Sequence, residues 1–378
     1  MSDTQKHTKP NVPNLRFPGF EGEWESCELG EIAEFSKGAG ISKDQRSSDG
    51  NPCILYGELY TTYLTEIIDE VVSKTNLDPT GLVRSKANDI IIPASGETAI
   101  DISTARCVLQ DDVLLGGDLN IIRLFNQDGR FFSYQLNGVR KKDIARIAHG
   151  VSIVHLHGNA LSHITVNYPS RSEQEKISSL LSLIDQRIAI QNKVIEKYES
   201  LIKALAYEII GKNTANKTLS ECVCCTSSTL KESDLGGHGA IPAYGAAGIS
   251  GFTDNALSDE DSILITKDGS GVGSLRYVNG SHSFVGTLNS MTPQEGVYLP
   301  YIYYALQNVC FERYRTGQAI PHIYFKNYGK EAIYCPSFDN QKRLAKGFEM
   351  IDTKIGIERA VLQALQSAKA YLLSAMFI

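Results

Sequence analysis

The chain has 378 residues, of which 42% are hydrophobic and 21% charged, and its formal net charge at pH 7 is -6. One hydrophobic core rarely grows to this size, so we expect two or more domains. The acidic balance excludes a uniformly basic nucleic-acid binder, and no apolar run is long enough to cross a bilayer. Any DNA-binding surface must therefore be local.

The N-terminal stretch MSDTQKHTKPNVPN is polar and lacks the apolar core of a signal peptide. We therefore expect a flexible tail over residues 1–13 and a cytoplasmic location. In that compartment the eight cysteines should be mostly reduced thiols.

Two globular segments are predicted, over residues 14–170 and 213–337. Each contains short β-like runs, such as NDIIIPAS and NIIRLF in the first and DSILITKD and EAIYCPS in the second, punctuated by Gly, Asn and Asp. Residues 1–169 carry a net charge of -6 and residues 213–336 one of -3, so neither segment is basic. We expect two mixed α/β domains rich in loops.

A phrase near the middle of the chain recurs at its end. PSRSEQEKISSLLSLID at 169–185 matches PSFDNQKRLAKGFEMID at 336–352, an offset of 167 residues. GDLN at 117–120 also aligns with GTLN at 286–289, and ILYG at 54–57 with PAYG at 242–245. At the offset of 167 the single-residue matches are Gly150 with Gly317, Ile153 with Ile320, His155 with His322, and Tyr134 with Tyr301. The pattern predicts a tandem duplication.

The first copy ends in a heptad pattern. Apolar residues recur in steps of four and three with one polar break, which predicts a coiled-coil helix over 171–212. Ser172 and Glu175 form a capping-box pattern after Pro169, and Gly211 is expected to end the helix in the left-handed conformation. About 39 residues at 1.5 Å each give roughly 58 Å. The predicted seam is Ile177, Leu181, Ile184, Ile188, Gln191, Ile195, Tyr198, Ile202, Leu205 and Ile209.

The second copy predicts a matching helix over 338–378. Its polar break, Glu358, falls at the place of Gln191, and Lys369 interrupts the seam again. A narrow apolar seam cannot be buried on one helix, so we expect the two helices to pair antiparallel. Two unrelated surface helices, each packed on its own domain, are the alternative. This seam is Leu344, Phe348, Ile351, Ile355, Glu358, Leu362, Leu365, Leu372 and Met376.

Motifs for catalysis are weak. GSGVGS at 269–274 does not have the G-x-G-x-x-G spacing and is interpreted as a glycine-rich turn rather than a nucleotide loop. Cys222 and Cys225 form a C-x-x-C, but Cys310 and Cys335 are isolated, so buried structural thiols are favoured over zinc ligands. The histidines of the first copy could serve as metal ligands, as DNA contacts or as ordinary surface and core residues; they are His149, His155, His157 and His163.

A stronger signal is the segment 298–334, which holds eight of the 18 tyrosines, with basic residues interleaved in FERYRTGQAIPHIYFKNYGK. Basic side chains can bind phosphates, while Tyr, Gln and His can stack or read base edges. A Tyr-rich core edge beside solvated charges is the alternative interpretation.

The chain resembles the specificity subunit of a type I restriction-modification system. The resemblance rests on YPSRSEQEKISSLLSLIDQRIAIQNKVIEKYESLIKAL and its repeat, on RFPGFEGEWESCELGEIAEFSKG, on IPAYGAAGISGF and on TGQAIPHIYF. It implies two target recognition domains alternating with two long helices that pair as an antiparallel coiled coil, related by a pseudo-twofold internal repeat. Each domain would bind half of a bipartite, asymmetric DNA sequence, and the helices would fix the spacer.

The resemblance also implies a chain without catalytic activity of its own. It would bind double-stranded DNA, two methyltransferase subunits and, in some systems, two restriction subunits. S-adenosylmethionine would then be the cofactor of the methyltransferase partner, and none is expected in this chain.

Loop position and side-chain chemistry nominate the DNA contacts. In the first copy the candidates are Ser95, Glu97, Thr98, Arg146, Ser152, His155 and His157, and in the second Lys267, Ser270, Arg313, Arg315, Gln318, His322, Tyr324 and Lys326. Two other classes stay open: a coiled-coil scaffold for proteins, which would leave no footprint on DNA, and an enzyme, which should bind S-adenosylmethionine itself.

Overall fold

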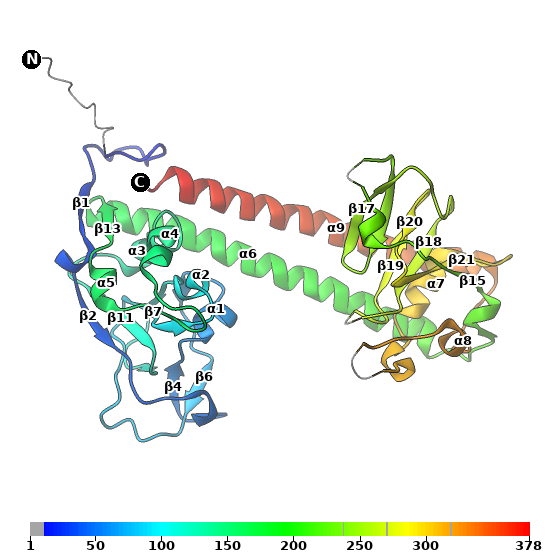
Figure 1. Cartoon of the computed structure of the whole chain (residues 1–378), viewed down its shortest axis with the longest axis horizontal. Coiled ribbons are helices and arrows are strands. Elements are labelled where there is room, and N and C mark those ends of the chain that lie inside the picture. The colour runs from blue at the N-terminus through cyan, green and yellow to red at the C-terminus, as the bar shows by residue number, and fades with distance from the viewer. Residues whose placement is uncertain (1–10, 237, 270, 318–319) are drawn as a thin grey trace, which may run out of the picture. The chain divides into compact units, whose positions relative to one another are not determined.

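The computed structural model describes residues 11–236, 238–269, 271–317 and 320–378. The chain divides into two compact units. Unit 1 contains Met1–Gln191 and Val361–Ile378, and unit 2 contains Asn192–Ala360. Two long helices, α6 (Arg171–Ala206) and α9 (Phe338–Ala375), each contribute to both units; they are the long green and red helices of Figure 1.

Unit 1 is built on a five-stranded sheet with the order β2-β11-β7-β9-β5. Its central strand β7 reads DIIIP and is buried throughout, as expected for a strand covered on both faces. All neighbouring strands are antiparallel except β9 and β5. The strands are β2 (Ala33–Lys37), β11 (Leu119–Leu124), β7 (Asp89–Pro93), β9 (Arg106–Val108) and β5 (Ile67–Ile68).

A smaller sheet of order β10-β4-β6-β3 and two strand pairs complete the β-structure of unit 1 (Figure 1). The strands are β10 (Leu114–Leu115), β4 (Asn51–Ile54), β6 (Ser73–Thr75) and β3 (Arg46–Ser47), with β1 (Glu25–Glu28) paired to β13 (Thr165–Tyr168) and β8 (Ser95–Gly96) to β12 (Val154–His155). The helices are α1 (Glu58–Thr61), α2 (Ala99–Ile102), α3 (Gly129–Asn137), α4 (Lys141–Ile147), α5 (Gly158–Ser162) and the 3-10 turns η1 (Leu29–Glu31) and η2 (Lys43–Gln45).

The main core of unit 1 includes both the start of α6 and the last residues of the chain. Ile177 and Leu181 of α6 are buried in it, together with Phe377. Phe377 stacks at 5.0 Å from Phe131, which also packs edge-on at 5.7 Å against Trp24, the one tryptophan of the sequence. The long helices are therefore part of the domain core and not detachable additions.

Unit 2 repeats the central sheet of unit 1. Its strand order β15-β21-β18-β19 corresponds to β2-β11-β7-β9, and β18, like β7, is buried throughout. The antiparallel strand pair β14–β22 of unit 2 corresponds to the pair β1–β13 of unit 1. The strands are β15 (Val223–Ser227), β21 (Leu288–Pro293), β18 (Ser262–Thr266), β19 (Leu275–Val278), β14 (Lys217–Thr218) and β22 (Ala332–Ile333).

A three-stranded sheet of order β17-β16-β20 and short helices complete unit 2 (Figure 1). These elements are β17 (Gly248–Thr253), β16 (Ile241–Gly245), β20 (Ser283–Phe284), α7 (Leu299–Leu306), α8 (Phe325–Tyr328), and the 3-10 turns η4 (Leu219–Glu221), η5 (Glu232–Asp234) and η6 (Phe311–Tyr314). The two units thus carry the mixed α/β architecture and the internal repeat predicted from the sequence.

The glutamine shared by the two repeated phrases explains part of the repetition. Gln174 is buried; its Oε1 accepts a hydrogen bond from Asp128 N at 3.0 Å, and its Nε2 donates to Pro169 O at 2.8 Å. Gln341 makes the same two bonds, from Tyr298 N at 2.8 Å and to Pro336 O at 2.8 Å. Asp128 and Tyr298 are the N-cap residues of α3 and α7. Each glutamine therefore fixes the start of a long helix against its domain.

The aspartate that closes each phrase has a matching role. Tyr134 on α3 donates to Asp185 at 2.7 Å, and Tyr304 on α7 donates to Asp352. The predicted match of Tyr134 with Tyr301 is wrong, because Tyr301 instead donates to the backbone oxygen of Tyr334. Tyr134 therefore corresponds to Tyr304, an offset of 170 residues instead of 167. Unit 1 has more residues than unit 2 between α3 and the repeated phrase, and these residues include α4.

The predicted alignment of ILYG with PAYG is wrong by two residues. Ile54 pairs with Leu115, and Tyr244 pairs with Phe284, in the two equivalent parallel strand pairs. Tyr244 therefore corresponds to Ile54, and Leu55 falls at the place of Gly245. Unit 1 has more residues than unit 2 between this strand and the central buried strand, so the sequences could not be aligned correctly here.

The first helix begins at Arg171 as predicted, but the predicted capping differs from the structure at both ends. Ser170 O accepts from Glu173 N and Gln174 N, so the helix begins before Ser172, and Glu175 bonds to Arg171 instead of capping. At the other end Gly211 lies inside a π-helical turn, η3 (Tyr207–Gly211), and is not left-handed. The bond from Lys212 N to Tyr207 O closes that wider turn.

Lys369 does more than interrupt the seam. Its Nζ lies 2.6 Å from Glu66 and 2.7 Å from Asp185, within unit 1, and all three side chains are at most 16% exposed. Burial is the largest influence on the lysine and opposes its charge, but the two carboxylates outweigh it, so the pKa of Lys369 is raised. A position that looked like a defect in the heptad pattern is a buried ion triad.

Candidate nucleic-acid interface

In unit 1 two loops meet at the end of the buried strand β7. The first, residues 94–98, continues from that strand, and the second is a hairpin formed by residues 149–155. Strands β8 and β12 pair Ser95 with His155, and Leu156 N donates to Ala94 O at 2.9 Å. The sheet therefore fixes both loops at one edge.

The hairpin is closed tightly by its own backbone. His149 N donates to His155 O at 2.9 Å, and His155 N donates to His149 O at 2.7 Å. Gly150 has φ +127, and a Cβ there would lie 2.0 Å from Ile153 O, so the turn requires glycine. Between the closing histidines, Val151, Ser152 and Ile153 are exposed.

Unit 2 builds the same pair of loops after β18. Ile323 N donates to Lys267 O at 2.9 Å, and Thr316 and His322 exchange backbone hydrogen bonds of 2.9 and 2.8 Å. Gly317 has φ +85, and a Cβ there would lie 2.5 Å from Ile320 O. The predicted matches of Gly150 with Gly317, Ile153 with Ile320 and His155 with His322 are thereby confirmed.

The loop pair brings together some of the residues nominated in unit 1. His155, Ser152 and His157 are exposed on or next to the hairpin, whereas Ser95 is largely buried. Thr98 caps α2, because its Oγ1 accepts from Asp101 N at 3.1 Å; Glu97 beside it is exposed. These positions leave His155, Ser152 and Glu97 as the side chains best placed to reach a ligand.

In unit 2 the nominated residues surround the second loop. His322 Nδ1 lies 2.9 Å from Asp268 Oδ1, and its ring is 6.3 Å from that of Tyr324. Lys326 Nζ lies over the Tyr324 ring at 5.4 Å, and Lys267 begins the first loop. Ser270 and Gln318 lie outside the described residues. The described set combines a cation, an imidazole and an exposed aromatic ring.

Three nominated arginines are already engaged by carboxylates. Arg146 lies 2.8 Å from Asp143, Arg315 lies 2.6 Å from Glu312, and Arg313 binds Glu331, a hydrogen bond that raises the pKa of Arg313. All three arginine side chains are at least 43% exposed. Exposed ion pairs contribute about 0–1 kcal/mol, so a DNA phosphate can replace the carboxylate at small cost for Arg146 and Arg315. Glu331 is only 15% exposed, so the pair of Arg313 is harder to replace.

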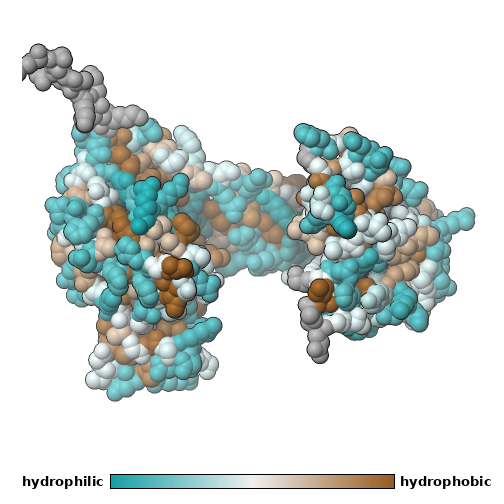
Figure 2. Space-filling view, viewed as in Figure 1, coloured by the Kyte–Doolittle hydropathy of each residue, from teal (hydrophilic) through white to brown (hydrophobic). Residues whose placement is uncertain are grey.

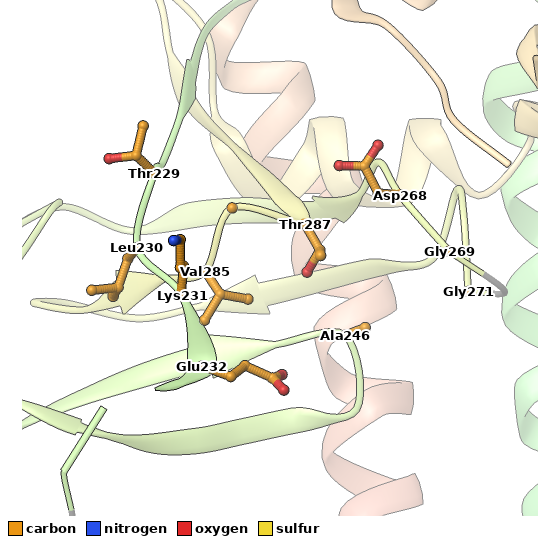
Figure 3. A pocket seen from close by; sticks show the side chains of 11 residues that line it. Thr229, Leu230, Lys231, Glu232, Ala246, Asp268, Gly269, Gly271, Val285 and Thr287 are labelled. Carbon is orange, nitrogen blue, oxygen red and sulfur yellow. The ribbon is translucent and has the colours of Figure 1, made fainter. Parts of the chain in front are cut away.

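A depression beside the unit 2 loops was not anticipated from the sequence. It has a volume of about 490 Å³ and is lined from separate loops by Lys231, Glu232, Asp268 and Thr287, whose side chains are seen in Figure 3. Its lining residues come from segments far apart in the sequence, around Lys231, Asp268 and Thr287, so no local pattern could have revealed this opening.

The cysteines do not form a ligand set. Cys222 is buried and its thiol is hydrogen-bonded to that of Cys335, a neighbour that the sequence separation concealed. Burial raises the pKa of the half-buried Cys225 to about 11, while Cys224 is exposed, contrary to the prediction of buried thiols. Within the described ranges, no group of three or more His, Cys, Asp or Glu could hold a metal ion.

The visible surface is mixed in character. On the face shown in Figure 2 hydrophilic side chains predominate, and apolar ones form small separate patches. Among the helices of the described residues, none is long and apolar enough to span a membrane.

Comparison with known proteins places these loops in context. The family model described as the type I restriction modification DNA specificity domain matches twice, over residues 21–200 and 216–367. No curated protein matches the sequence.

Two solved structures are similar over nearly the whole chain. The type I restriction-modification S subunit from M. genitalium has a TM-score of 0.67 at 20% identity, covering 97% of this chain and 99% of that one. A chain from a structural study of complex assembly and conformational transition in the type I R-M system has a TM-score of 0.56 at 15% identity, covering 96% and 98%. At these identities the likeness concerns the fold.

Proposed function

Because the chain belongs to the type I restriction-modification DNA specificity family and recognises DNA sequence in such a system, we propose that each unit reads one half of a bipartite, asymmetric target. The observation that carries this proposal is the repeated loop pair. Each unit presents the same glycine-closed hairpin beside a loop from its central buried strand, with different side chains on the two copies. Equal frameworks with unequal side chains suit two unequal half-sites.

The contacts proposed in these loops combine two kinds of recognition. Arginines and lysines around the hairpins would bind phosphates, and His155, His322 and Tyr324 would meet bases. Ser95 and Thr98 would position the loops, since Ser95 is buried and Thr98 caps α2.

We propose that α6 and α9 pair antiparallel and set the spacer between the half-sites. Within unit 1 Lys369 binds Asp185, and within unit 2 Arg359 binds Glu199 at 2.6 Å, so later residues of α6 meet earlier ones of α9. Of the predicted seam residues, Ile209 is exposed, whereas those from Ile177 to Leu205 and from Leu344 to Met376 are buried or half-buried. Both facts support an apolar seam shared by α6 and α9, and the length of the paired helices would then set the spacer between the half-sites.

The outer faces of the helices offer docking sites for the methyltransferase subunits. Leu183 and Ile190 are 59% and 54% exposed, seven residues apart on one face of α6. Met350 and Ile357, at the offset of 167, are 68% and 53% exposed on α9. Equivalent apolar pairs support two copies of one partner. S-adenosylmethionine would be bound by that partner, which would perform the methyl transfer, and this chain would do no chemistry.

The test is to co-express the chain with a type I methyltransferase subunit in an unmethylated host and to map adenine methylation by single-molecule sequencing. We expect a split, asymmetric motif with a fixed gap. A stable complex that adds no methylation would instead favour a protein scaffold. Leu183→Glu with Ile190→Glu should remove one methyltransferase copy in native mass spectrometry, and Ala189→Glu, at an exposed position on another face of α6, is the control.

A further inference from the structure

The tips of the two hairpins expose aliphatic side chains where polar ones would be expected. Val151 is 98% exposed and Ile153 is 59% exposed in unit 1, and Ile320, the match of Ile153, is 60% exposed in unit 2. Turns usually carry Gly, Pro, Asn, Asp or Ser. A single exposed apolar residue is common on protein surfaces, but here both repeats expose an isoleucine at the same position. The same exception at matching positions of both repeats calls for an apolar partner.

The backbone holds these isoleucines in defined positions. In each hairpin the carbonyl of the isoleucine lies against the positive-φ glycine, and the closing backbone bonds follow within two residues. The exposed side chain therefore points from a framework that need not rearrange on binding. A preorganised aliphatic group suits a contact whose geometry is fixed, such as a base edge.

Resting on the proposed function, we propose that Ile153 and Ile320 read thymine by packing against its C5-methyl group in the major groove, one thymine in each half-site. The methyl group is the apolar feature of a base edge in the major groove. Exposed His155 and half-buried His322 stand two residues away. A ring nitrogen of His155 can bond to a neighbouring base edge, and so can Nε2 of His322, whose Nδ1 lies 2.9 Å from Asp268. Each hairpin then combines one apolar and one polar contact.

Insertion of the tip between base pairs fits the structure less well. Wedges that unstack bases present a continuous apolar surface, and in unit 1 exposed Ser152 stands between Val151 and Ile153. A hydroxyl driven into the stack would lose its water without a partner. An edge contact leaves Ser152 free to bond to DNA or water.

The experiment uses the complex of the full chain with its methyltransferase and duplexes carrying the mapped target. Each thymine of the target is replaced in turn by deoxyuridine, which lacks only the methyl group, and the Kd is measured by fluorescence anisotropy. For the wild type we expect one thymine per half-site whose replacement weakens binding about three- to fivefold, the effect of one buried methyl group.

The variants assign each effect to its side chain. With Ile153→Ala, binding should weaken and deoxyuridine at the matching thymine should have no further effect, while the other half-site keeps its response; Ile320→Ala should show the reverse. Val72→Ala and Ile249→Ala, at positions that are 58% and 56% exposed outside the hairpins, should leave both responses intact.

Three results would overturn the inference: a half-site without thymine, additive effects of variant and deoxyuridine, or a 2-aminopurine signal showing unstacked bases. These results differ from failure of the proposed function, in which the wild-type complex would show no split motif at all. Unchanged melting temperatures of the alanine variants would confirm that folding is not the cause.

Discussion

Replacing Lys369 by alanine removes the cation from the buried triad of unit 1 and leaves Glu66 and Asp185 without it. Their side chains are only 11% and 8% exposed, so water cannot take over the role of the ammonium group. Removing one partner of a buried ion pair costs about 3–5 kcal/mol, because the remaining charge is uncompensated. For a unit of this size, a loss of stability of this magnitude lowers the melting point by roughly 6–20 °C.

Differential scanning calorimetry of the purified chain measures the loss. Arg359→Ala is the matched control, because its ion pair with Glu199 joins the same two helices but is 63% and 42% exposed. That variant should lose less than about 1 kcal/mol. Equal effects of the two substitutions, or a loss below about 1 kcal/mol for Lys369→Ala, would refute the assignment of a buried triad.

Two further experiments test whether the loss of stability is electrostatic in origin. The combination of Lys369→Met, Glu66→Gln and Asp185→Asn removes both signs of charge and should recover most of the stability. The pKa of Lys369 is raised in the folded chain, so the difference between wild type and Lys369→Met should be constant below the ordinary lysine pKa and should shrink as pH rises through the higher folded value. A difference independent of alkaline pH would point to packing alone.

Three other predictions concern the reading of DNA. Seven residues inserted after Glu196 of α6, with seven after Ala360 of α9, should lengthen the spacer in mapped methylation while both half-sites stay the same; altered half-sites would mean that the helices read bases. Gly150→Ala should cost roughly 1–3 kcal/mol of local strain, lower the melting point by roughly 2–12 °C and weaken binding to one half-site, whereas Gly117→Ala, with open space around it, should be neutral in the same anisotropy assay. Arg315→Ala and His322→Ala should each weaken recognition of the unit 2 half-site, and unchanged affinity and methylation specificity for both would reject those contacts.

The heptad pattern predicted the two long helices because burial acts on every third or fourth residue and leaves a trace in the sequence. The hairpin matches were equally predictable, since Gly150 and Gly317 meet a local backbone requirement. The capping of the first helix was not, because Gln174 fixes its start through Pro169 and Asp128, and Asp128 is distant in sequence. The interaction that decides the position is tertiary.

The contacts of individual side chains were the least predictable part of the site. Arg146, Arg313 and Arg315 were nominated for their charge, but each is paired with a carboxylate. The partners of Arg146 and Arg315 lie three residues earlier, a spacing that the sequence shows, whereas Glu331 lies 18 residues from Arg313 and could not be recognised as its partner. The exposed tips at Ile153 and Ile320 were noticed only as matches in the repeat, because hydrophobicity alone does not distinguish a core residue from an exposed one. Burial decides that question, and it depends on the whole fold.

The two repeats differ at the position of Lys369, and this difference bears on the proposed helix pairing. At the offset of 167, Lys369 corresponds to Ile202, and unit 2 has a cavity of about 260 Å³ beside that residue in place of a triad. A duplicated chain with one seam pattern could pair its helices with those of another molecule. Lys369 finds both carboxylates only when the end of α9 lies against unit 1, so any other pairing leaves a buried charge unmatched. The Lys369→Ala variant should therefore also form more dimer in light scattering, and a wholly monomeric variant would leave the triad with a role in stability alone.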